Sequence, residues 1–441
     1  MAKPAYRHQY HQAVTYKILL GRKPGVIHCD LDQSLGIVRA LERLTLGLEQ
    51  IVYLVGWQYD GHDSKYPAFF EVNERLKRPG DANARQSLLW LMREARAQNG
   101  FVSTHINLCD AYENSPLWEE YAAADLFVRE KDGSLQKGGV WDGEQSYRVS
   151  KAREWAAGRT QQRIDRFLEL LPIADAGTVH IDAFFPKPSP YHGVTLEDEI
   201  KTVQEIMRYW RSRRVDVTGE LFIHEYAGLM PLGWHLNLDE ASRLKYPPSV
   251  VCGGGPAWNV RREKYADRAA WVGVFTAPEA GCLYEEAWGY SIDDDICSPG
   301  DVARFAERFF LRTVPWLHMN RHAIVRHVHS RDSYEVHLAG NLVSRVRVKD
   351  RQHSLEEDGR PLVNGEDLCV PAGWRKQTLI AYSKSGSSRR WELPPSWRGI
   401  ARVKVTPLYP FDSRPPRDAK VTRRVIQVRL DPGAAVAITP A

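Results

Sequence analysis

TVHIDAFF, at residues 178–185, is followed by the long segment TLEDEIKTVQEIMRYWRSRR at 195–214 and then by VDVTGELF at 215–222. The two outer segments are short and mostly apolar, which is typical of strands buried on both faces. The middle segment is amphipathic, acidic at its start and basic at its end, as the helix dipole favours. The stretch therefore predicts two parallel strands joined by a helix that packs outside the sheet.

The same alternation extends in both directions along the chain. Strand-like segments are expected at 25–32, 50–57 and 101–108, and amphipathic helices follow at 34–47, 82–100 and 146–171. About eight such units up to a last helix at 300–320 predict a (β/α)8 TIM barrel of the α/β class. No G-x-G-x-x-G or G-x-x-x-x-G-K-[ST] motif follows an early strand, so a nucleotide-binding sheet is not indicated.

A different pattern begins at His322. Short segments such as YEVHLAG, TLIAYSKSG and RVIQVRLD alternate between apolar and polar residues and are separated by Gly, Pro, Asp and Ser. This pattern predicts an all-β sandwich of seven or eight strands. The expected domains are an N-terminal extension at 1–23, a catalytic (β/α)8 barrel at 24–321 and a C-terminal β-sandwich domain at 322–441.

Composition excludes several classes of protein. The 441 residues are 43% hydrophobic and 26% charged, and the net charge of +5 is spread along the chain. Nucleic acid is therefore not an expected partner. Six cysteines without zinc-ligand spacing indicate thiols in a reducing compartment. No apolar run of about 18 residues and no secretory h-region occur, so we expect a soluble cytoplasmic protein without membrane contact. The sequence leaves the oligomeric state open.

The 14 tryptophans and 19 tyrosines suggest a ligand. Several stand beside Gly, Asp or His, as in GWQYDGHD, GGVWDGEQSY, PLGWH, GPAW and EEAWGY. A pyranose offers a CH-rich face for stacking on an aromatic ring and a rim of hydroxyls for carboxylates and imidazoles. The sequence therefore favours a glycan or small glycoside as substrate, with the remaining aromatic residues filling the core.

Polar residues at the carboxyl ends of the strands are the candidates for the site, because barrel enzymes place their chemistry there. Asp182 and Glu220 end consecutive strands and form the natural pair of carboxyl groups. Hydrolysis of a glycosidic bond needs such a pair, one protonated and the other ionised. The further candidates for contacts with substrate are Asp63, Trp57, His62, Asn107, Trp141, His180, His224 and Trp258.

A family resemblance rests on a series of segments in fixed order. VYLVGWQYDGHDS, FVSTHINLCDAYENSPLW, WDGEQSY, VHIDAFF and GELF occur between residues 52 and 222. This series resembles the catalytic barrel of glycoside hydrolase family 101, the retaining endo-α-N-acetylgalactosaminidases, and the related family 129 α-N-acetylgalactosaminidases. The resemblance implies that Asp182 is the nucleophile and Glu220 the general acid and base. It also implies that Asp63 holds sugar hydroxyls and that Trp57 and Trp141 are subsite walls.

The expected activity is that of a retaining α-glycosidase acting on α-linked N-acetylgalactosamine or galactose by double displacement, with no metal and no cofactor. Two alternatives remain open. One is a carbohydrate-binding or catalytically degenerate barrel. The other is a metal-dependent sugar deacetylase, in which His62, His105 and His180 converge with an aspartate, although neither HxH nor HExxH occurs.

Overall fold

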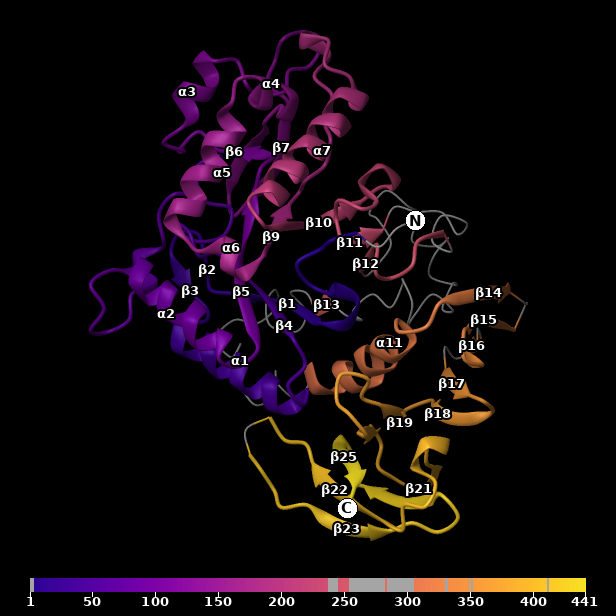
Figure 1. Cartoon of the computed structure of the whole chain (residues 1–441). Helices are drawn as coiled ribbons and strands as arrows, with labels where there is room; N and C mark the ends of the chain where they lie inside the picture. Colours follow the sequence, from indigo (N-terminus) through magenta and orange to yellow (C-terminus); the bar gives the residue numbers. More distant parts are fainter. Residues whose placement is uncertain are drawn as a thin grey trace.

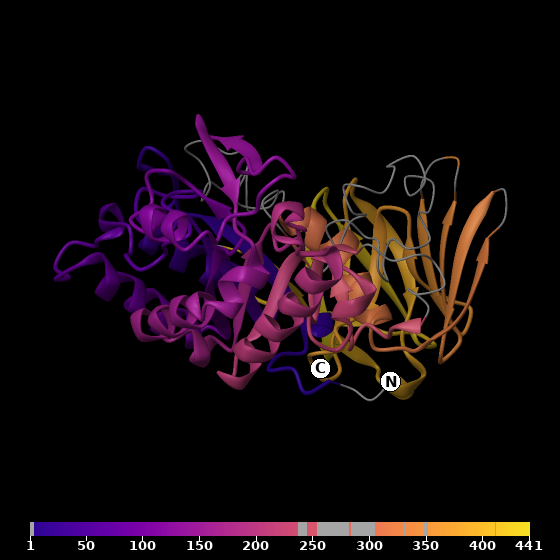
Figure 2. The same cartoon turned by 90° about the horizontal axis from the view of Figure 1, so that it is seen from above.

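The computed structural model of the chain describes residues 4–236, 245–253, 282–283, 305–329, 332–347, 349, 352–410 and 412–441. Two parts stand side by side in both views of the molecule (Figures 1 and 2). The first is a parallel sheet with helices outside it, and the second consists of antiparallel strands. Within the ranges just given, no helix combines the length and the apolar character needed to cross a bilayer.

Eight parallel strands form the first sheet, in the order β13-β1-β4-β5-β9-β10-β11-β12. The strands are β1 (Val14–Leu19), β4 (Gln50–Val55), β5 (Gly100–Asn107), β9 (Thr178–Asp182), β10 (Asp216–Phe222), β11 (Leu232–Leu236), β12 (Cys252–Gly253) and β13 (Cys282–Leu283). Sheet order follows chain order, and the last strand returns to the first, with Thr15 opposite Cys282. Between β12 and β13 the described residues record no pairing. The predicted α/β class and parallel sheet are thus confirmed.

The first strand lies earlier in the chain than predicted. β1 occupies Val14–Leu19 and is buried throughout, whereas the expected strand at 25–32 holds only the short β3 and the start of a helix. Residues 1–23 are therefore not a separate extension, because they contain a strand of the sheet. Asp30, expected at a strand end, instead caps the helix by accepting a hydrogen bond from the Gln33 N–H at 2.7 Å.

Helices connect the strands and cover the outside of the sheet (Figure 1). They are α1 (Leu31–Leu44), α2 (Ala84–Arg96), α3 (Trp118–Ala123), α4 (Lys151–Ala156), α5 (Arg159–Leu170), α6 (Ile173–Ala176), α7 (Leu196–Ser212) and α11 (Val314–Met319). The predicted β9-α7-β10 unit is present, and Thr195 and Asp198 form a capping box at the start of α7. The Trp210 ring of α7 packs edge-on against Phe167 of α5 at 6.3 Å.

The second part is entirely β, as predicted, but has more strands than expected. Its strands are β14 (Ile324–His329), β15 (Ser333–Leu338), β16 (Leu342–Arg347), β17 (His353–Glu357), β18 (Arg360–Asn364), β19 (Asp367–Pro371), β20 (Leu379–Ser383), β21 (Ser387–Glu392), β22 (Arg402–Pro407), β23 (Arg417–Lys420), β24 (Val425–Leu430) and β25 (Ala434–Pro440). Ten of them form one antiparallel sheet, and β21 pairs with β24 separately. Trp391 of β21 and Ile426 of β24 share a buried core with Val405 and Ile438 of the larger sheet.

Two small sheets lie near the carboxyl ends of the parallel strands. A hairpin joins β2 (Gly21–Arg22) to β3 (Val26–Ile27), and β6 (Asp110–Ala111), β7 (Lys137–Trp141) and β8 (Glu144–Arg148) form a three-stranded sheet. The Lys23 ammonium binds the Glu144 carboxylate at 2.9 Å and so ties the two small sheets together.

Candidate active site

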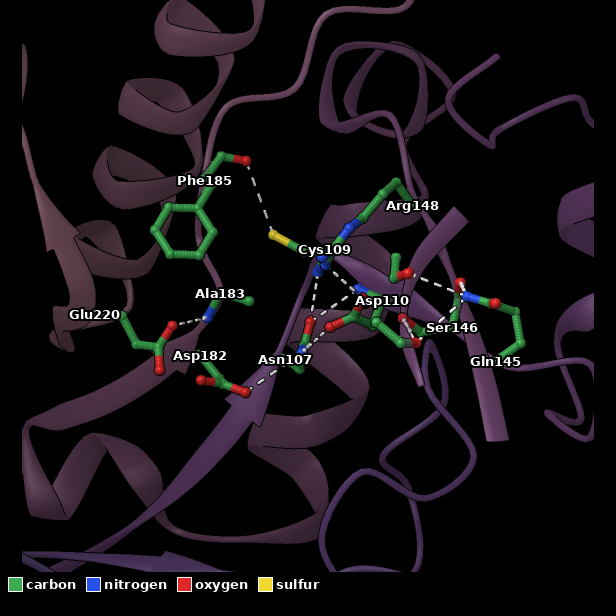
Figure 3. Close-up of polar contacts among 12 residues, drawn as sticks. Asn107, Cys109, Asp110, Gln145, Ser146, Arg148, Asp182, Ala183, Phe185 and Glu220 are labelled. Atoms are coloured by element: carbon green, nitrogen blue, oxygen red, sulfur yellow. Dashed lines mark hydrogen bonds and ion pairs between the residues drawn. The ribbon is translucent and has the colours of Figure 1, made fainter. Parts of the chain in front are cut away.

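Asp182 and Glu220 lie side by side at the ends of β9 and β10. The strand register places Gly219 opposite Ile181, so the next residue of each strand is the carboxylic acid. Glu220 is among the groups that lower the pKa of Asp182. The Ala183 N–H donates to Glu220 Oε2 at 3.2 Å (Figure 3). Ala183 has a φ of +45°, a conformation that costs a non-glycine residue energy and that concentrates at functional sites.

The β5 strand approaches Asp182 from the other side. Asn107 pairs with Asp182 across the strands, and its Nδ2 lies 3.5 Å from Asp182 Oδ2. The Nε2 of His105 lies 3.4 Å from Asp182 Oδ1. These are long contacts. The Asp182 side chain is 15% exposed, whereas that of His105 is 1% exposed. A ligand can therefore reach the carboxylate but not the imidazole behind it.

The environment keeps Asp182 ionised. Burial acts to raise the pKa of this carboxyl group, but His105, Lys17 and Glu220 together hold the pKa well below its usual range. Asp182 is thus an ionised carboxylate beside the carboxyl group of Glu220.

Asn107 and Arg148 hold a second aspartate beside this pair (Figure 3). Asn107 Nδ2 donates to Asp110 Oδ2 at 2.7 Å, and Arg148 Nη1 donates to Asp110 Oδ1 at 2.5 Å. The Asn107 Oδ1 accepts from the Cys109 and Asp110 N–H groups at 2.7 and 2.9 Å. Asn107 is fully buried, so it positions Asp110 and Asp182 and is not the substrate contact that was predicted.

His62 and Asp63 form the third side of the site. His62 Nε2 lies 3.4 Å from Asp63 Oδ2. Burial, followed by the charges of Asp182 and Asp110, raises the pKa of Asp63 well above its usual value, whereas burial and His105 lower the pKa of His62. One ligand atom from each of His62, Asp63 and Asp182 lies within 4.8 Å of the others, so these three could hold a metal ion.

The predictions for Trp57 and His180 are wrong, because both side chains are completely buried. Trp57 donates from Nε1 to the His105 carbonyl oxygen at 3.0 Å and packs against Phe167. His180 bonds Thr218 through Nδ1 at 2.9 Å, and its ring lies 5.3 Å from that of His105. Trp57 therefore contacts the backbone of β5, and the His180 ring packs against the His105 ring. Neither side chain forms a wall of the site.

The other predicted contacts differ in their positions. Trp141 is 42% exposed at the end of β7 and remains a candidate for stacking. His224 is exposed, and its Nδ1 lies 2.7 Å from the Tyr246 hydroxyl. Its place in the lining of the site stays a prediction. Trp258 lies outside the described residues.

Three residues of the site were absent from the predicted set, namely Lys17, Asp110 and Arg148, and His105 was named only as a possible metal ligand. Lys17 is fully buried within β1, and its charge acts on Asp182, His62 and His180. A lysine within the apolar run VTYKIL was the available signal. Asp110 and His105 stood at a predicted strand end, but nothing in the periodicity indicated the Arg148 partner.

Residues 1–211 match the model of a protein family described as endo-α-N-acetylgalactosaminidase, glycoside hydrolase family 101. No curated protein matches the chain. Among solved structures, the chain is similar to the α-N-acetylgalactosaminidase NagBb from Bifidobacterium bifidum in complex with GalNAc, with a TM-score of 0.55 and 13% identity over 78% of this chain and 57% of that one. The ligand-free NagBb structure gives a TM-score of 0.53 and 13% identity over 78% and 58%. The chain thus spans less than two thirds of the length of these proteins, and the likeness concerns the fold.

Proposed function

From the match of residues 1–211, which relates the chain to the family 101 glycoside hydrolases and confirms the predicted resemblance, we propose that the protein is a retaining α-glycosidase. Its substrates are glycans that carry α-linked N-acetylgalactosamine or galactose. The observation that carries the proposal is the strand register, which places Asp182 and Glu220 at neighbouring positions of β9 and β10. Retaining enzymes need closely spaced carboxyl groups, whereas inverting ones leave room for a water molecule between them.

In the first step the ionised Asp182 attacks the anomeric carbon while Glu220 gives its proton to the glycosidic oxygen. The bond to the leaving group breaks, and an ester forms between Asp182 and the sugar. The low pKa of Asp182 supports the role of nucleophile. The position of Glu220 next to it, on the neighbouring strand, supports the role of acid. The Ala183 N–H holds one oxygen of Glu220 and orients the other.

In the second step Glu220, now ionised, takes a proton from water as the water attacks the same carbon. The ester breaks, the Asp182 carboxylate is restored and the sugar leaves with its original α configuration. Asn107 and His105 then receive the restored negative charge through the contacts that they already make.

Asp63 and Trp141 are the proposed sugar contacts. Asp63 lies beside His62 and Asp182, and its carboxyl oxygens can accept hydrogen bonds from sugar hydroxyls. Trp141 offers a partly exposed indole for the CH-rich face of a pyranose. We further propose that the eight parallel strands close into a (β/α)8 barrel, followed by a β-sandwich from about residue 322. The buried thiols Cys29, Cys109 and Cys369 support a reducing, cytoplasmic location.

Proton NMR of the hydrolysis of an aryl α-N-acetylgalactosaminide and an aryl α-galactoside tests the proposal. We expect the α-anomer of the free sugar to appear first, followed by slow mutarotation, and no turnover of the matched β-glycosides. First appearance of the β-anomer would overturn the retaining mechanism. If neither compound reacts, binding on a glycan array would favour the catalytically degenerate alternative.

A second candidate function rests on the His62, Asp63 and Asp182 cluster. A divalent ion bound there would supply a Lewis acid for the removal of an acetyl group from a sugar, as in metal-dependent deacetylases. Release of acetate from N-acetylgalactosamine that is abolished by a chelator and restored by Zn²⁺ would support this function. Release of the aryl group that is insensitive to chelator would support the glycosidase.

A further inference from the structure

The last helix of the first part, α11, lies beside β17, β18 and β19 of the antiparallel sheet and away from β9 and β10 (Figure 1). A cluster of two histidines and a glutamate belongs to this region. His318 belongs to the last turn of α11, His322 follows three residues after that helix ends, and Glu357 ends β17. One ligand atom from each lies within 4.8 Å of the others. We propose that His318, His322 and Glu357 bind a Zn²⁺ ion that joins the two parts of the molecule.

The ligand types and spacing suit zinc. Two imidazoles and one carboxylate are a known zinc donor set, and water completes the tetrahedron. Ligand atoms about 2.0 to 2.1 Å from a tetrahedral ion are roughly 3.3 Å apart. His318 Nε2 lies 3.6 Å from Glu357 Oε1, and the His318 and His322 rings lie 5.2 Å apart. Small side-chain rotations would therefore bring all three atoms to bonding distance.

The Nε2 atom of His318 is buried, and among the described residues no acceptor lies within hydrogen-bond distance of it. The His318 side chain is only 6% exposed. The contact with Glu357 Oε1 is an ion-pair contact of 3.6 Å, longer than a hydrogen bond. A buried imidazole nitrogen without a partner costs free energy, which a bound cation would remove.

The surrounding residues orient the other two ligands as the outer shell of a metal site does. His322 Nδ1 lies 2.9 Å from the Ala339 carbonyl oxygen, which can only accept, so Nδ1 carries the hydrogen and Nε2 the lone pair. Arg360 donates to Glu357 Oε2 and leaves Oε1 for the ion. Arg360 is itself held by the Glu392 carbonyl oxygen at 3.3 Å.

The chain offers a matched control in the same sheet. His337 Nε2 lies 3.3 Å from Glu335 Oε2. Among the described residues, no third histidine, cysteine or carboxylate completes a metal site with this pair. Among the described residues, the cluster of His62, Asp63 and Asp182 in the candidate active site is the other group that could hold a metal ion. Variants of His337 and His62 therefore test whether zinc binds specifically at His318, His322 and Glu357 or binds to histidine and carboxylate groups in general.

The test is titration of the full chain, stripped with chelator, with Zn²⁺ in competition with a chromophoric chelator. We expect a tight site that is lost or weakened by at least 10- to 100-fold in both His322→Gln and Glu357→Gln and is kept in His337→Gln and His62→Gln. Zn²⁺ should also raise the midpoint of thermal unfolding of wild type but not of the two site variants. Circular dichroism checks that these variants, altered at partly exposed positions, remain folded.

Absence of zinc binding in the wild type would overturn the proposal. Equal binding by wild type, His322→Gln and Glu357→Gln would overturn it as well. Loss of the tight site only in His62→Gln would assign the ion to the other cluster and would likewise contradict the proposal.

Discussion

Two buried aspartates on neighbouring strands occupy opposite ends of the parallel sheet. At the amino end, Asp216 accepts from the Arg7 N–H at 2.6 Å, and the Tyr10 hydroxyl lies 3.3 Å away. At the carboxyl end, Asp182 has contacts of 3.4 and 3.5 Å with His105 and Asn107. Burial raises the pKa of Asp216, whereas the pKa of Asp182 is held low against burial by charged and polar neighbours. The contacts of Asp216 are thus short, whereas those of Asp182, the proposed nucleophile, are long.

Of the substitutions that test this comparison, Asp182→Asn should have the largest effect. Loss of the nucleophile should reduce kcat by on the order of 10⁴- to 10⁶-fold, because no covalent intermediate can form. The matched variant Asp216→Asn should keep activity within a few-fold. Steady-state hydrolysis of the aryl α-glycoside measures both. Comparable losses in the two variants would show that the two ends of the sheet do not differ in the way described.

Glu220→Gln should have the next largest effect. Without its general acid and base, the enzyme should slow by roughly 10²- to 10⁴-fold on natural α-glycosides. The loss should be smaller for the first step with an activated aryl leaving group, which needs little protonation. Glu225→Gln, at an exposed neighbouring position, is the control and should stay near wild-type rates. An unchanged rate in Glu220→Gln would remove the proposed role.

Asp216→Ala should act on stability. The Arg7 N–H would lose its acceptor, at a cost of about 1 to 3 kcal/mol in the free energy of unfolding. The raised pKa of Asp216 also gives a pH dependence. Its stabilising contribution is full below about pH 4 and is lost as pH rises through the folded-state pKa. Urea unfolding across this range measures it, and Asp216→Asn should abolish the pH dependence without the same loss of stability.

His105→Leu should move the acid limb of the activity profile. His105 helps to lower the pKa of Asp182, so its removal should raise that pKa. The acid limb of kcat/KM should then shift toward higher pH. His105→Gln keeps an amide donor and should shift less. A limb that stays in place in both variants would show that His105 does not tune the carboxylate.

Trp141→Ala should give the smallest effect. A stacking contact worth about 0.5 to 1.5 kcal/mol corresponds to a rise in KM of roughly 2- to 10-fold, with kcat little changed. Val140→Ala, at the adjacent exposed position of β7, serves as the control. Equal KM values for Trp141→Ala and wild type would exclude the indole as a subsite wall.

The β9-α7-β10 unit could be predicted because each of its features is local: apolar strands, an amphipathic helix and a capping box. The first strand could not be predicted in the same way. Lys17 makes VTYKIL look half-polar, and its burial depends on carboxylates and imidazoles from distant strands. Asp182 and Glu220 could be identified as candidates because each lies at the end of a predicted strand. Their catalytic roles remain predictions.

Burial of the site residues depends on the paths of the loops, which periodicity does not encode. Trp57 follows its strand like any strand-end residue, but the chain folds back so that the Asn73 N–H bonds its carbonyl oxygen at 2.8 Å and its ring is covered. Arg148 reaches Asp110 only because β6 and β8 pair antiparallel, whereas the sequence pattern placed Arg148 in a helix at 146–171.

The pairing of β1 with β13 has a consequence during synthesis. Thr15 leaves the ribosome long before its partner Cys282, and at about 5 to 20 residues per second the delay is roughly ten seconds to one minute. Throughout that time β1 has an open edge that invites pairing with other nascent chains. A charged side chain in such a strand discourages that pairing. Lys17 places such a charge within β1.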